Sequence, residues 1–244
     1  MRSHRVIIAV ALSPLIFGAG LLMPTAFGAG KGDDPKEALQ ELQDFIGGWK
    51  GTVDMKKKVD KGPQFWKENA NWSWRFKGKD VWLSVDMPES KLFKSGEMRF
   101  ISASGKYQLT LTDMKDQKAA YLGEMKKGSL IVERIHPTSK DVEQIKLSTA
   151  AGGVRLVQIF SVKLAERTLF TEQYKIAYTK EGESFGAAAG KKGPECVVTG
   201  GLGTMAVSFN GNTYYVCCTG CRDAFNENPA KIIAEYKARK AKGD

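Results

Sequence analysis

Histidine is scarce in this chain of 244 residues, and cysteine is absent from most of it. Only His4 and His136 are present, and His4 lies in an N-terminal segment that we expect to be removed, so one imidazole remains for chemistry. This count excludes a three-histidine zinc site, an H-E-x-x-H protease and a Cys2His2 zinc finger. The four cysteines all lie in the last fifth of the chain: Cys196, Cys217, Cys218 and Cys221. We therefore expect any specific chemistry to lie near the C-terminus.

Long apolar runs are also absent, except at the N-terminus. Two arginines precede an apolar run from Val6 to Phe17, and Ala26-Phe27-Gly28 offers the small residues that signal peptidases recognise. These features predict a secretory signal peptide over residues 1–28, and hence an exported protein, periplasmic or extracellular, with no membrane span in the mature chain. The alternative is an uncleaved membrane anchor, because the stretch from Val6 to Phe27 approaches the length of a span.

Concentrated charge is missing as well. The formal net charge is +10, and loss of the two N-terminal arginines leaves +8. The basic residues form short, separated groups such as Lys56 to Lys58, which we interpret as solvated strand ends. A nucleic-acid-binding surface needs basic residues gathered on one element, so we expect no nucleic-acid partner.

The middle of the chain contains a regular alternation of apolar and polar residues. Between Ala70 and Phe76, for example, Trp72 and Trp74 share one face while Ser73 lies on the other. A period of two residues is typical of half-buried β-strands. The same alternation recurs at Val81–Val85, Tyr107–Leu111, Leu130–Val132, Val154–Phe160 and Phe170–Tyr178. About nine or ten antiparallel strands predict a closed barrel or a two-sheet sandwich, since closure removes exposed strand edges.

A helix is expected immediately before the strands. Asp34 is a suitable N-cap, with Pro35 at the first helical position. The apolar residues that this helix should bury are Leu39, Leu42, Phe45 and Ile46. It should stop at Gly47-Gly48, and together with the strands it predicts a β-barrel domain over residues 29–185.

The transition into the first strand, Phe45-Ile46-Gly47-Gly48-Trp49-Lys50-Gly51, resembles the entry of lipocalin-like barrels. In that family the tryptophan fills the barrel floor, and the resemblance implies this role for Trp49. Two uses of the interior stay open: a cup for an apolar small molecule, lined by Trp72 and Trp74, or a core that these side chains fill. We favour the second, because barrels of this size are often packed solid. His136 is expected to be a loop residue rather than a catalyst.

A linker and a small domain follow the barrel. Residues 186–194 are rich in glycine, alanine and lysine and have no apolar periodicity, which is typical of a linker. Residues 195–244 are too few to be stabilised by an apolar core alone, so a metal or disulfides should hold this domain together.

The cysteine spacing favours a metal. Cys196, Cys217 and Cys221 form a C-x20-C-x3-C pattern, with Cys218 as an extra thiol. The segment between the first two is predicted to be a hairpin turned by Asn210-Gly211, a preferred type I′ pair, and helices follow. This is the plan of a treble-clef zinc finger, and thiolates suit zinc or Cu(I). We therefore predict a mainly β protein: an antiparallel lipocalin-like β-barrel followed by a small treble-clef-like α+β metal-binding domain.

The C-terminal residues also resemble a YHS or TRASH domain. The matching segments are Cys196-Val197-Val198-Thr199-Gly200, Phe209 to Arg222, Phe225 and Asn228-Pro229. That family is regarded as a small metal-binding module of heavy-metal transport, sensing and resistance proteins. The resemblance implies that such a module occupies about the last 50 residues, 195–244.

The resemblance further implies which residues bind the metal. The family ligands fall on Cys196, Cys217 and Cys221, with an open or borrowed fourth position for which Cys218 is the nearest candidate. The chain departs from the family pattern at Val197, where proline is usual, and at Thr199, where many members have a second cysteine.

Two other interpretations of the cysteines stay open. Cys218-Thr219-Gly220-Cys221 is a C-x-x-C motif at a helix start, as in thiol-disulfide redox proteins, although the expected βαβ unit is missing. Two structural disulfides would also suit an exported, non-catalytic binding protein. The main prediction is an exported protein that binds zinc or copper for storage, delivery or sensing, and is not an enzyme.

Overall fold

The computed structural model describes residues 34–56, 64–182 and 193–243. The predicted signal peptide and nearly all of the predicted linker lie outside these ranges, so both stay predictions. Contacts among these described residues group them into one compact unit. Among the described residues, no helix is long and apolar enough to cross a membrane.

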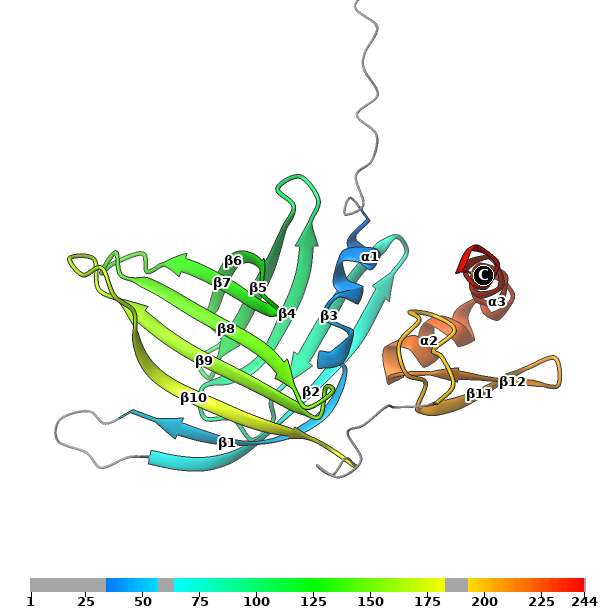
Figure 1. Cartoon of the computed structure of the whole chain (residues 1–244), viewed down its shortest axis with the longest axis horizontal. Coiled ribbons are helices and arrows are strands. Elements are labelled where there is room, and N and C mark those ends of the chain that lie inside the picture. Colours follow the sequence, from blue (N-terminus) through cyan, green and yellow to red (C-terminus); the bar gives the residue numbers. More distant parts are fainter. Residues whose placement is uncertain (1–33, 57–63, 183–192, 244) are drawn as a thin grey trace, which may run out of the picture. The chain divides into compact units, whose positions relative to one another are not determined.

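Ten antiparallel strands form a closed barrel, which confirms the predicted fold class (Figure 1). Each strand pairs with the next one in the sequence, and β10 pairs with β1 to close the sheet. The strands are β1 (Gly47–Met55), β2 (Gln64–Lys77), β3 (Asp80–Asp86), β4 (Phe93–Ile101), β5 (Lys106–Asp113), β6 (Lys118–Lys126), β7 (Ser129–Ile135), β8 (Val142–Ala150), β9 (Arg155–Lys163) and β10 (Thr171–Lys180).

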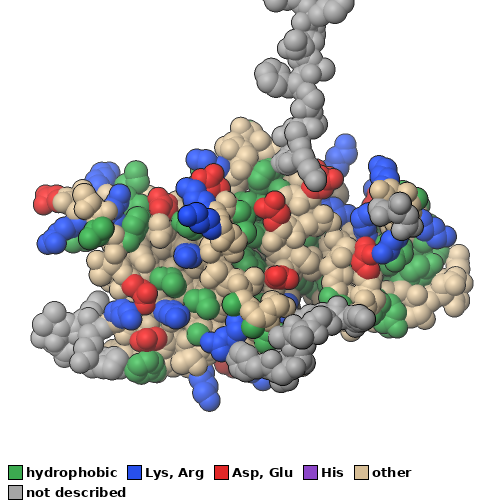
Figure 2. Space-filling model, viewed as in Figure 1, with side chains coloured by type: hydrophobic (Ala, Val, Ile, Leu, Met, Phe, Trp, Pro, Cys, Tyr) green, Lys and Arg blue, Asp and Glu red, His purple; other side chains and the backbone are tan. Residues whose placement is uncertain are grey.

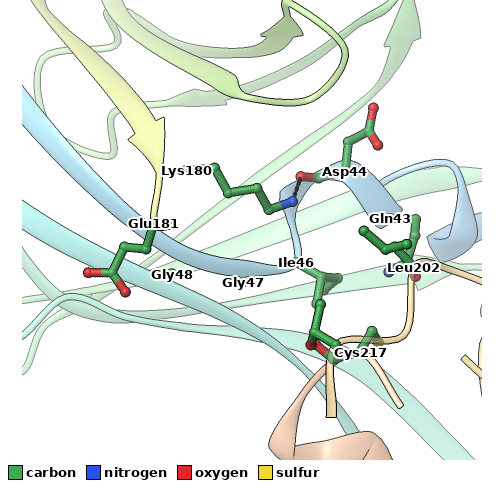
Figure 3. A pocket seen from close by; sticks show the side chains of 10 residues that line it. Gln43, Asp44, Ile46, Gly47, Gly48, Lys180, Glu181, Leu202 and Cys217 are labelled. Carbon is green, nitrogen blue, oxygen red and sulfur yellow. Dashed lines mark hydrogen bonds between the residues drawn. The ribbon is translucent and has the colours of Figure 1, made fainter. Parts of the chain in front are cut away.

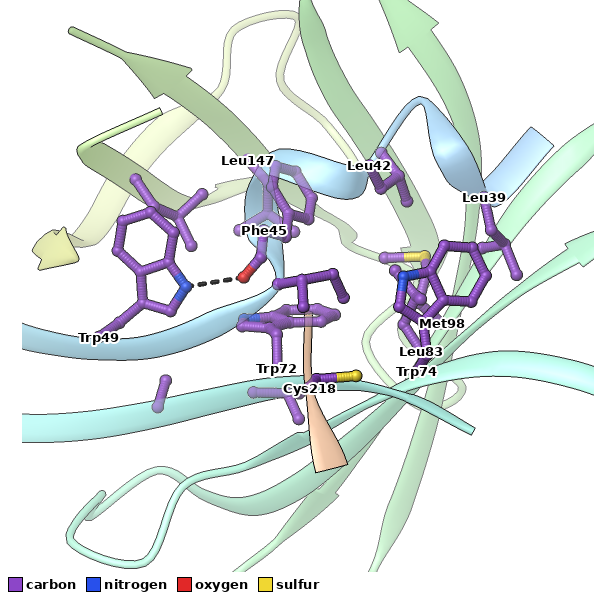
Figure 4. Packing of buried hydrophobic residues seen from close by; sticks show 14 of the residues in the cluster. Leu39, Leu42, Phe45, Trp49, Trp72, Trp74, Leu83, Met98, Leu147 and Cys218 are labelled. Atoms are coloured by element: carbon purple, nitrogen blue, oxygen red, sulfur yellow. Dashed lines mark hydrogen bonds between the residues drawn. The ribbon is translucent and has the colours of Figure 1, made fainter. Parts of the chain in front are cut away.

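The expected alternation buries Trp49 of β1 and Trp72 and Trp74 of β2. Trp49 and Trp74 are fully buried, and Trp72 is 4% exposed. The Trp49 indole N–H donates a hydrogen bond of 2.7 Å to the Phe45 carbonyl, as Figure 4 shows. The interior around these tryptophans is therefore packed, and the cavity beside Trp72 and Tyr178 has a volume of about 10 Å³.

The N-terminal helix is shorter than the sequence predicts. Helix α1 (Pro35–Gln40) gives way to a 3-10 turn, η1 (Gln43–Phe45), although all four expected apolar residues are buried. The Ala38 carbonyl explains the change, because it accepts hydrogen bonds from the Tyr107 hydroxyl at 2.7 Å and from the Glu41 amide at 3.2 Å. In a continued α-helix the Leu42 amide would donate to the Ala38 carbonyl, but here it donates to the Leu39 carbonyl instead.

The C-terminal module has the predicted hairpin and helices. Strands β11 (Met205–Phe209) and β12 (Asn212–Val216) pair across Asn210 and Gly211, whose φ angles of 49° and 75° are those of a type I′ turn. Helices α2 (Thr219–Glu227) and α3 (Pro229–Gly243) follow. The Asn228 side chain caps α3 by accepting a hydrogen bond from the Lys231 amide at 3.2 Å.

The module contacts the barrel. Helix α2 lies against β2, and a Cβ atom on Gly220 would lie 1.7 Å from the Trp74 carbonyl oxygen. Beside this contact, the Gln40 side-chain amide donates to the Thr199 carbonyl at 2.7 Å. Whether barrel and module fold independently, as the linker composition predicts, stays a prediction.

Charged side chains of both signs are interspersed over the face that Figure 2 shows, with no large area of one sign. This arrangement matches the scattered basic groups in the sequence.

Candidate metal centre

Three separate segments bring the cysteines of the C-x20-C-x3-C pattern together. Cys196 lies in a tight turn in which its amide donates to the Gly201 carbonyl at 2.6 Å and its carbonyl accepts from the Gly200 amide at 2.8 Å. Gly200 has a φ of 82°, which only glycine adopts freely. Cys217 follows the last residue of β12, and Cys221 lies in the first turn of α2. A tight turn, the end of β12 and the start of α2 thus supply the three sulfurs.

The sulfur atoms of Cys196, Cys217 and Cys221 all lie within 4.8 Å of one another. The Cys217 and Cys221 sulfurs are 3.5 Å apart, well beyond a disulfide bond of about 2.05 Å, and all four cysteines are free thiols. Cys196 and Cys221 are fully buried, and Cys217 is 8% exposed. A buried group of three thiols is the donor set that a soft or borderline metal ion prefers.

The spacing of the sulfurs fits such an ion. Zinc–sulfur bonds of about 2.3 Å at tetrahedral angles place two sulfurs about 3.8 Å apart. The separation between Cys217 and Cys221 is already close to this value, and the upper limit of 4.8 Å for the set requires only a small contraction. The three residues present could therefore hold zinc or Cu(I).

Cys218, the fourth candidate ligand, does not belong to the group of three. It is the N-cap residue of α2, is 6% exposed and belongs to the buried apolar cluster. Figure 4 shows it close to the tryptophans of β2, and a backbone hydrogen bond from Trp74 reaches its sulfur. The structure thus brings three of the four predicted ligands together and turns the fourth toward the barrel.

The thiols share protons because they are close together. Hydrogen bonds from Cys217 and Cys221 lower the pKa of Cys196 to about 2 and that of Cys218 to about 3. Hydrogen bonds to Cys196 and Cys218 raise the pKa of Cys217, and burial, followed by contact with the other thiols, raises the pKa of Cys221. Some sulfurs can ionise only while their neighbours stay protonated, so a full set of thiolates needs a compensating cation.

Two further residues support the cluster. Thr199 is 2% exposed, and its hydroxyl lies 3.6 Å from the Cys217 sulfur. In the sequence, Thr199 stands out only as a departure from the family pattern, and its place three residues after Cys196 is the signal that could have indicated this contact. Arg239 on α3 donates to the Glu195 carboxylate at 3.2 Å and to the carbonyls of Cys196 and Val197 at 3.4 and 3.3 Å. No local pattern predicted that contact, because about 40 residues separate Arg239 from its partners.

A cavity of about 280 Å³ lies beside the cluster and includes Cys217 in its lining (Figure 3). Across it, the Lys180 ammonium donates to the Asp44 carbonyl at 3.0 Å. Gln43 also lines it and accepts a hydrogen bond from the Trp74 indole at 3.0 Å. The cysteine cluster therefore lies next to a cavity of mixed polar and apolar lining, formed jointly by the module and the first turns of the barrel domain.

His136 takes no part in the cysteine cluster: it is a partly buried residue of the loop between β7 and β8. Its Nδ1 accepts hydrogen bonds from the amides of Thr138 and Ser139, both at 3.3 Å. It shapes its own loop, as the sequence predicted.

Comparisons with known proteins do not assign this site. No protein-family model matches the chain, and no curated protein matches it. Among solved structures, the crystal structure of Rv2717c from M. tuberculosis matches with a TM-score of 0.40 and 16% identity, covering 59% of this chain and 97% of that one. A match at this level carries no argument about the site, and the resemblances to YHS or TRASH domains and to lipocalins stay predictions.

Proposed function

We propose that this protein is an exported metal-binding protein that holds one zinc or copper ion through the thiolates of Cys196, Cys217 and Cys221. Its role would be storage, delivery or sensing of the ion, without catalysis. The observation that carries the proposal is the buried group of three sulfurs drawn from three different segments. Metal sites in proteins commonly take their ligands from several segments, which the fold brings together.

The number and burial of the thiols favour a metal over the two alternatives. A dithiol enzyme needs an exposed attacking thiolate, whereas Cys218 is 6% exposed and Cys221 is fully buried. Paired disulfides would use the sulfurs two at a time, whereas here three gather at one point.

The fourth coordination position decides the class of ion. Three thiolates alone suit Cu(I), whereas zinc is almost always four-coordinate in structural sites. Cys218 is the nearest candidate for a fourth ligand, since its sulfur exchanges hydrogen bonds with Cys217 and Cys221. In our proposal, Cys218 is the fourth ligand when the bound ion is zinc. When the ion is Cu(I), three sulfurs bind it and Cys218 stays in contact with the barrel.

The barrel supports the module in this proposal and does not require a ligand in its core. A cavity of about 10 Å³ holds at most one water molecule, so an apolar small molecule would need the core to open. The metal ion is the partner that the proposal assigns.

Metal analysis of the chain, purified without oxygen from its export compartment, tests the proposal. We expect about one ion per chain by elemental analysis, and an affinity at least about 100-fold weaker after Cys196→Ser, Cys217→Ser or Cys221→Ser. Cys218→Ser should reduce the affinity less, because Cys218 supplies at most the fourth ligand. A metal-free protein with its four cysteines oxidised in pairs would contradict the proposal.

The redox alternative needs its own measurement. The as-isolated protein should not turn over a mixed-disulfide substrate, because metal on Cys221 blocks thiol exchange. Robust turnover that disappears in Cys218→Ser would make the protein a thiol enzyme.

A further inference from the structure

The cysteine cluster offers three sulfurs and no fourth ligand of the usual kinds. Among the described residues, the side chains close enough to share one ion are Cys196, Cys217 and Cys221, with no histidine or carboxylate in the group. Cys218 lies outside it, and its sulfur receives a backbone hydrogen bond from Trp74 of the barrel. The group that lies beside the three sulfurs therefore bears on which ion the site prefers.

Thr199 is that group. Its side chain is buried, and its hydroxyl lies 3.6 Å from the Cys217 sulfur. Its hydroxyl and its backbone amide also form hydrogen bonds with the Cys196 sulfur. In a tetrahedral shell with bonds of about 2.3 Å to sulfur and about 2.1 Å to oxygen, the two ligand atoms lie about 3.6 Å apart. The hydroxyl is thus as far from the Cys217 sulfur as a fourth ligand would be.

The backbone holds Thr199 in this place from two sides. The Thr199 carbonyl accepts a hydrogen bond of 2.7 Å from the side-chain amide of Gln40, the last residue of α1. The next residue, Gly200, donates its amide to the Cys196 carbonyl at 2.8 Å and so closes the turn. The side chain at this position is therefore kept against the cluster, and its chemistry acts on the bound ion.

A hydroxyl in this place suits one of the two candidate ions better. Zinc takes thiolate, imidazole or carboxylate ligands and is almost always four-coordinate in structural sites. Cu(I) is a soft ion that thiolates select, and three of them suit it. A neutral hydroxyl therefore leaves Cu(I) fully coordinated by three sulfurs, whereas it leaves zinc one ligand short. Zinc can recruit Cys218 only at the expense of the hydrogen bond from Trp74.

We propose that the site prefers Cu(I) to zinc and that Thr199 is the residue that sets this preference. Thr199 keeps a fourth thiolate away from the ion, and it donates hydrogen bonds to the thiolates that bind the ion. The inference rests on the proposed metal-binding function and adds to it the identity of the ion and the residue that selects it.

Anaerobic competition of the full chain with a chromophoric chelator for each ion measures both affinities. Thr199→Cys should raise the zinc affinity at least about 100-fold, because it adds a fourth thiolate, and should change the Cu(I) affinity less than about 3-fold. Thr199→Ser keeps the hydroxyl and is the matched control, with both affinities unchanged. No gain for zinc, or an equal gain for both ions, would overturn the inference alone. A wild-type chain that binds neither ion would overturn the proposed function as well.

Cys218 gives a second measurement that does not depend on the folding of Thr199→Cys. In the wild-type background, Cys218→Ser should weaken zinc binding at least about 10-fold and Cu(I) binding less than about 3-fold, because only zinc needs the fourth sulfur. In the Thr199→Cys background, the same change should no longer affect zinc, since the new thiolate replaces Cys218. Equal effects of Cys218→Ser on the two ions in the wild-type background would overturn the proposal even if Thr199→Cys fails to fold.

Discussion

Raising the pH above 10 should unfold the barrel, because four of its tyrosines are buried and resist ionisation. Burial is the main cause that raises the pKa of each phenol well above 10. Nearby carboxylates raise the pKa of three of these phenols further: Glu41 beside Tyr107, Glu143 beside Tyr121 and Glu68 beside Tyr178. The four tyrosines, each at most 5% exposed, are Tyr107, Tyr121, Tyr174 and Tyr178.

The sign of the effect follows from proton binding. Above pH 10 the unfolded chain releases phenolic protons that the folded barrel keeps, so the stability is complete below pH 10 and falls as the pH rises. Each such tyrosine contributes a slope of about 1.4 kcal/mol per pH unit, and four contribute about 5–6. Against a total stability of about 5–15 kcal/mol, this slope predicts unfolding within about one to three pH units above 10.

Parallel alkaline titrations by phenolate absorbance and by far-ultraviolet circular dichroism measure this effect. Absorbance from the four buried tyrosines should appear only together with loss of the β-sheet signal. Tyr121→Phe should lower the slope of stability against pH by about a quarter. If all phenolate absorbance developed while the β-sheet signal stayed intact, the reasoning from burial would be refuted.

Three substitutions give further predictions. Tyr178→Phe removes the one hydrogen bond that the described residues donate to the Glu68 carboxylate, which is buried, and should cost about 1–3 kcal/mol in urea unfolding, whereas Glu68→Gln keeps an acceptor and should cost less; equal costs would contradict this. Gly220→Ala forces a Cβ atom against the Trp74 carbonyl and should lower stability by about 1–3 kcal/mol, so an unchanged melting temperature would refute the close contact. Arg239→Lys loses the planar group that spans the Cys196 turn and should speed metal loss to a chromophoric chelator, whereas Arg222→Lys, in an exposed ion pair, should not.

The barrel was predictable because its strands alternate strictly. Trp72 and Trp74 on one face of β2 predicted an inward face, and the register of β2 against β1 and β3 confirms it. The end of α1 was not predictable, since the hydroxyl that occupies the Ala38 carbonyl comes from Tyr107, 69 residues away. Local capping rules cannot include such a partner.

Polar residues inside the barrel escaped prediction for a related reason. Glu68 lies two residues before Ala70 and therefore shares its face, but a carboxylate normally marks the solvent side of a strand. Only the pairing of β1 with β10 brings the Tyr178 hydroxyl within 2.5 Å of it. Ser73 is buried on the opposite face of β2, the strand that α2 contacts.

In the cysteine cluster too, nearby residues in the sequence predicted one contact, whereas another depends on a residue far away in the sequence. The local C-x3-C spacing was enough to predict that Cys217 and Cys221 meet, because one strand end and one helical turn separate them. Cys217 and Cys218 are adjacent in sequence, so one turn decides which sulfur joins Cys196. That choice depends on Cys218 acting as the N-cap of α2, next to Trp74 of the barrel.

This placement gives Cys218 a different physical role from the other three cysteines. The turn that carries Cys196 is held by Arg239 of α3, and Cys217 is held by the hairpin. Cys218 instead lies where α2 meets β2, and its sulfur receives a backbone hydrogen bond from Trp74 of the barrel. To become a fourth ligand, Cys218 would have to turn toward the other three sulfurs and give up that bond. In the proposed site, a fourth sulfur ligand is therefore gained at the expense of a contact between module and barrel.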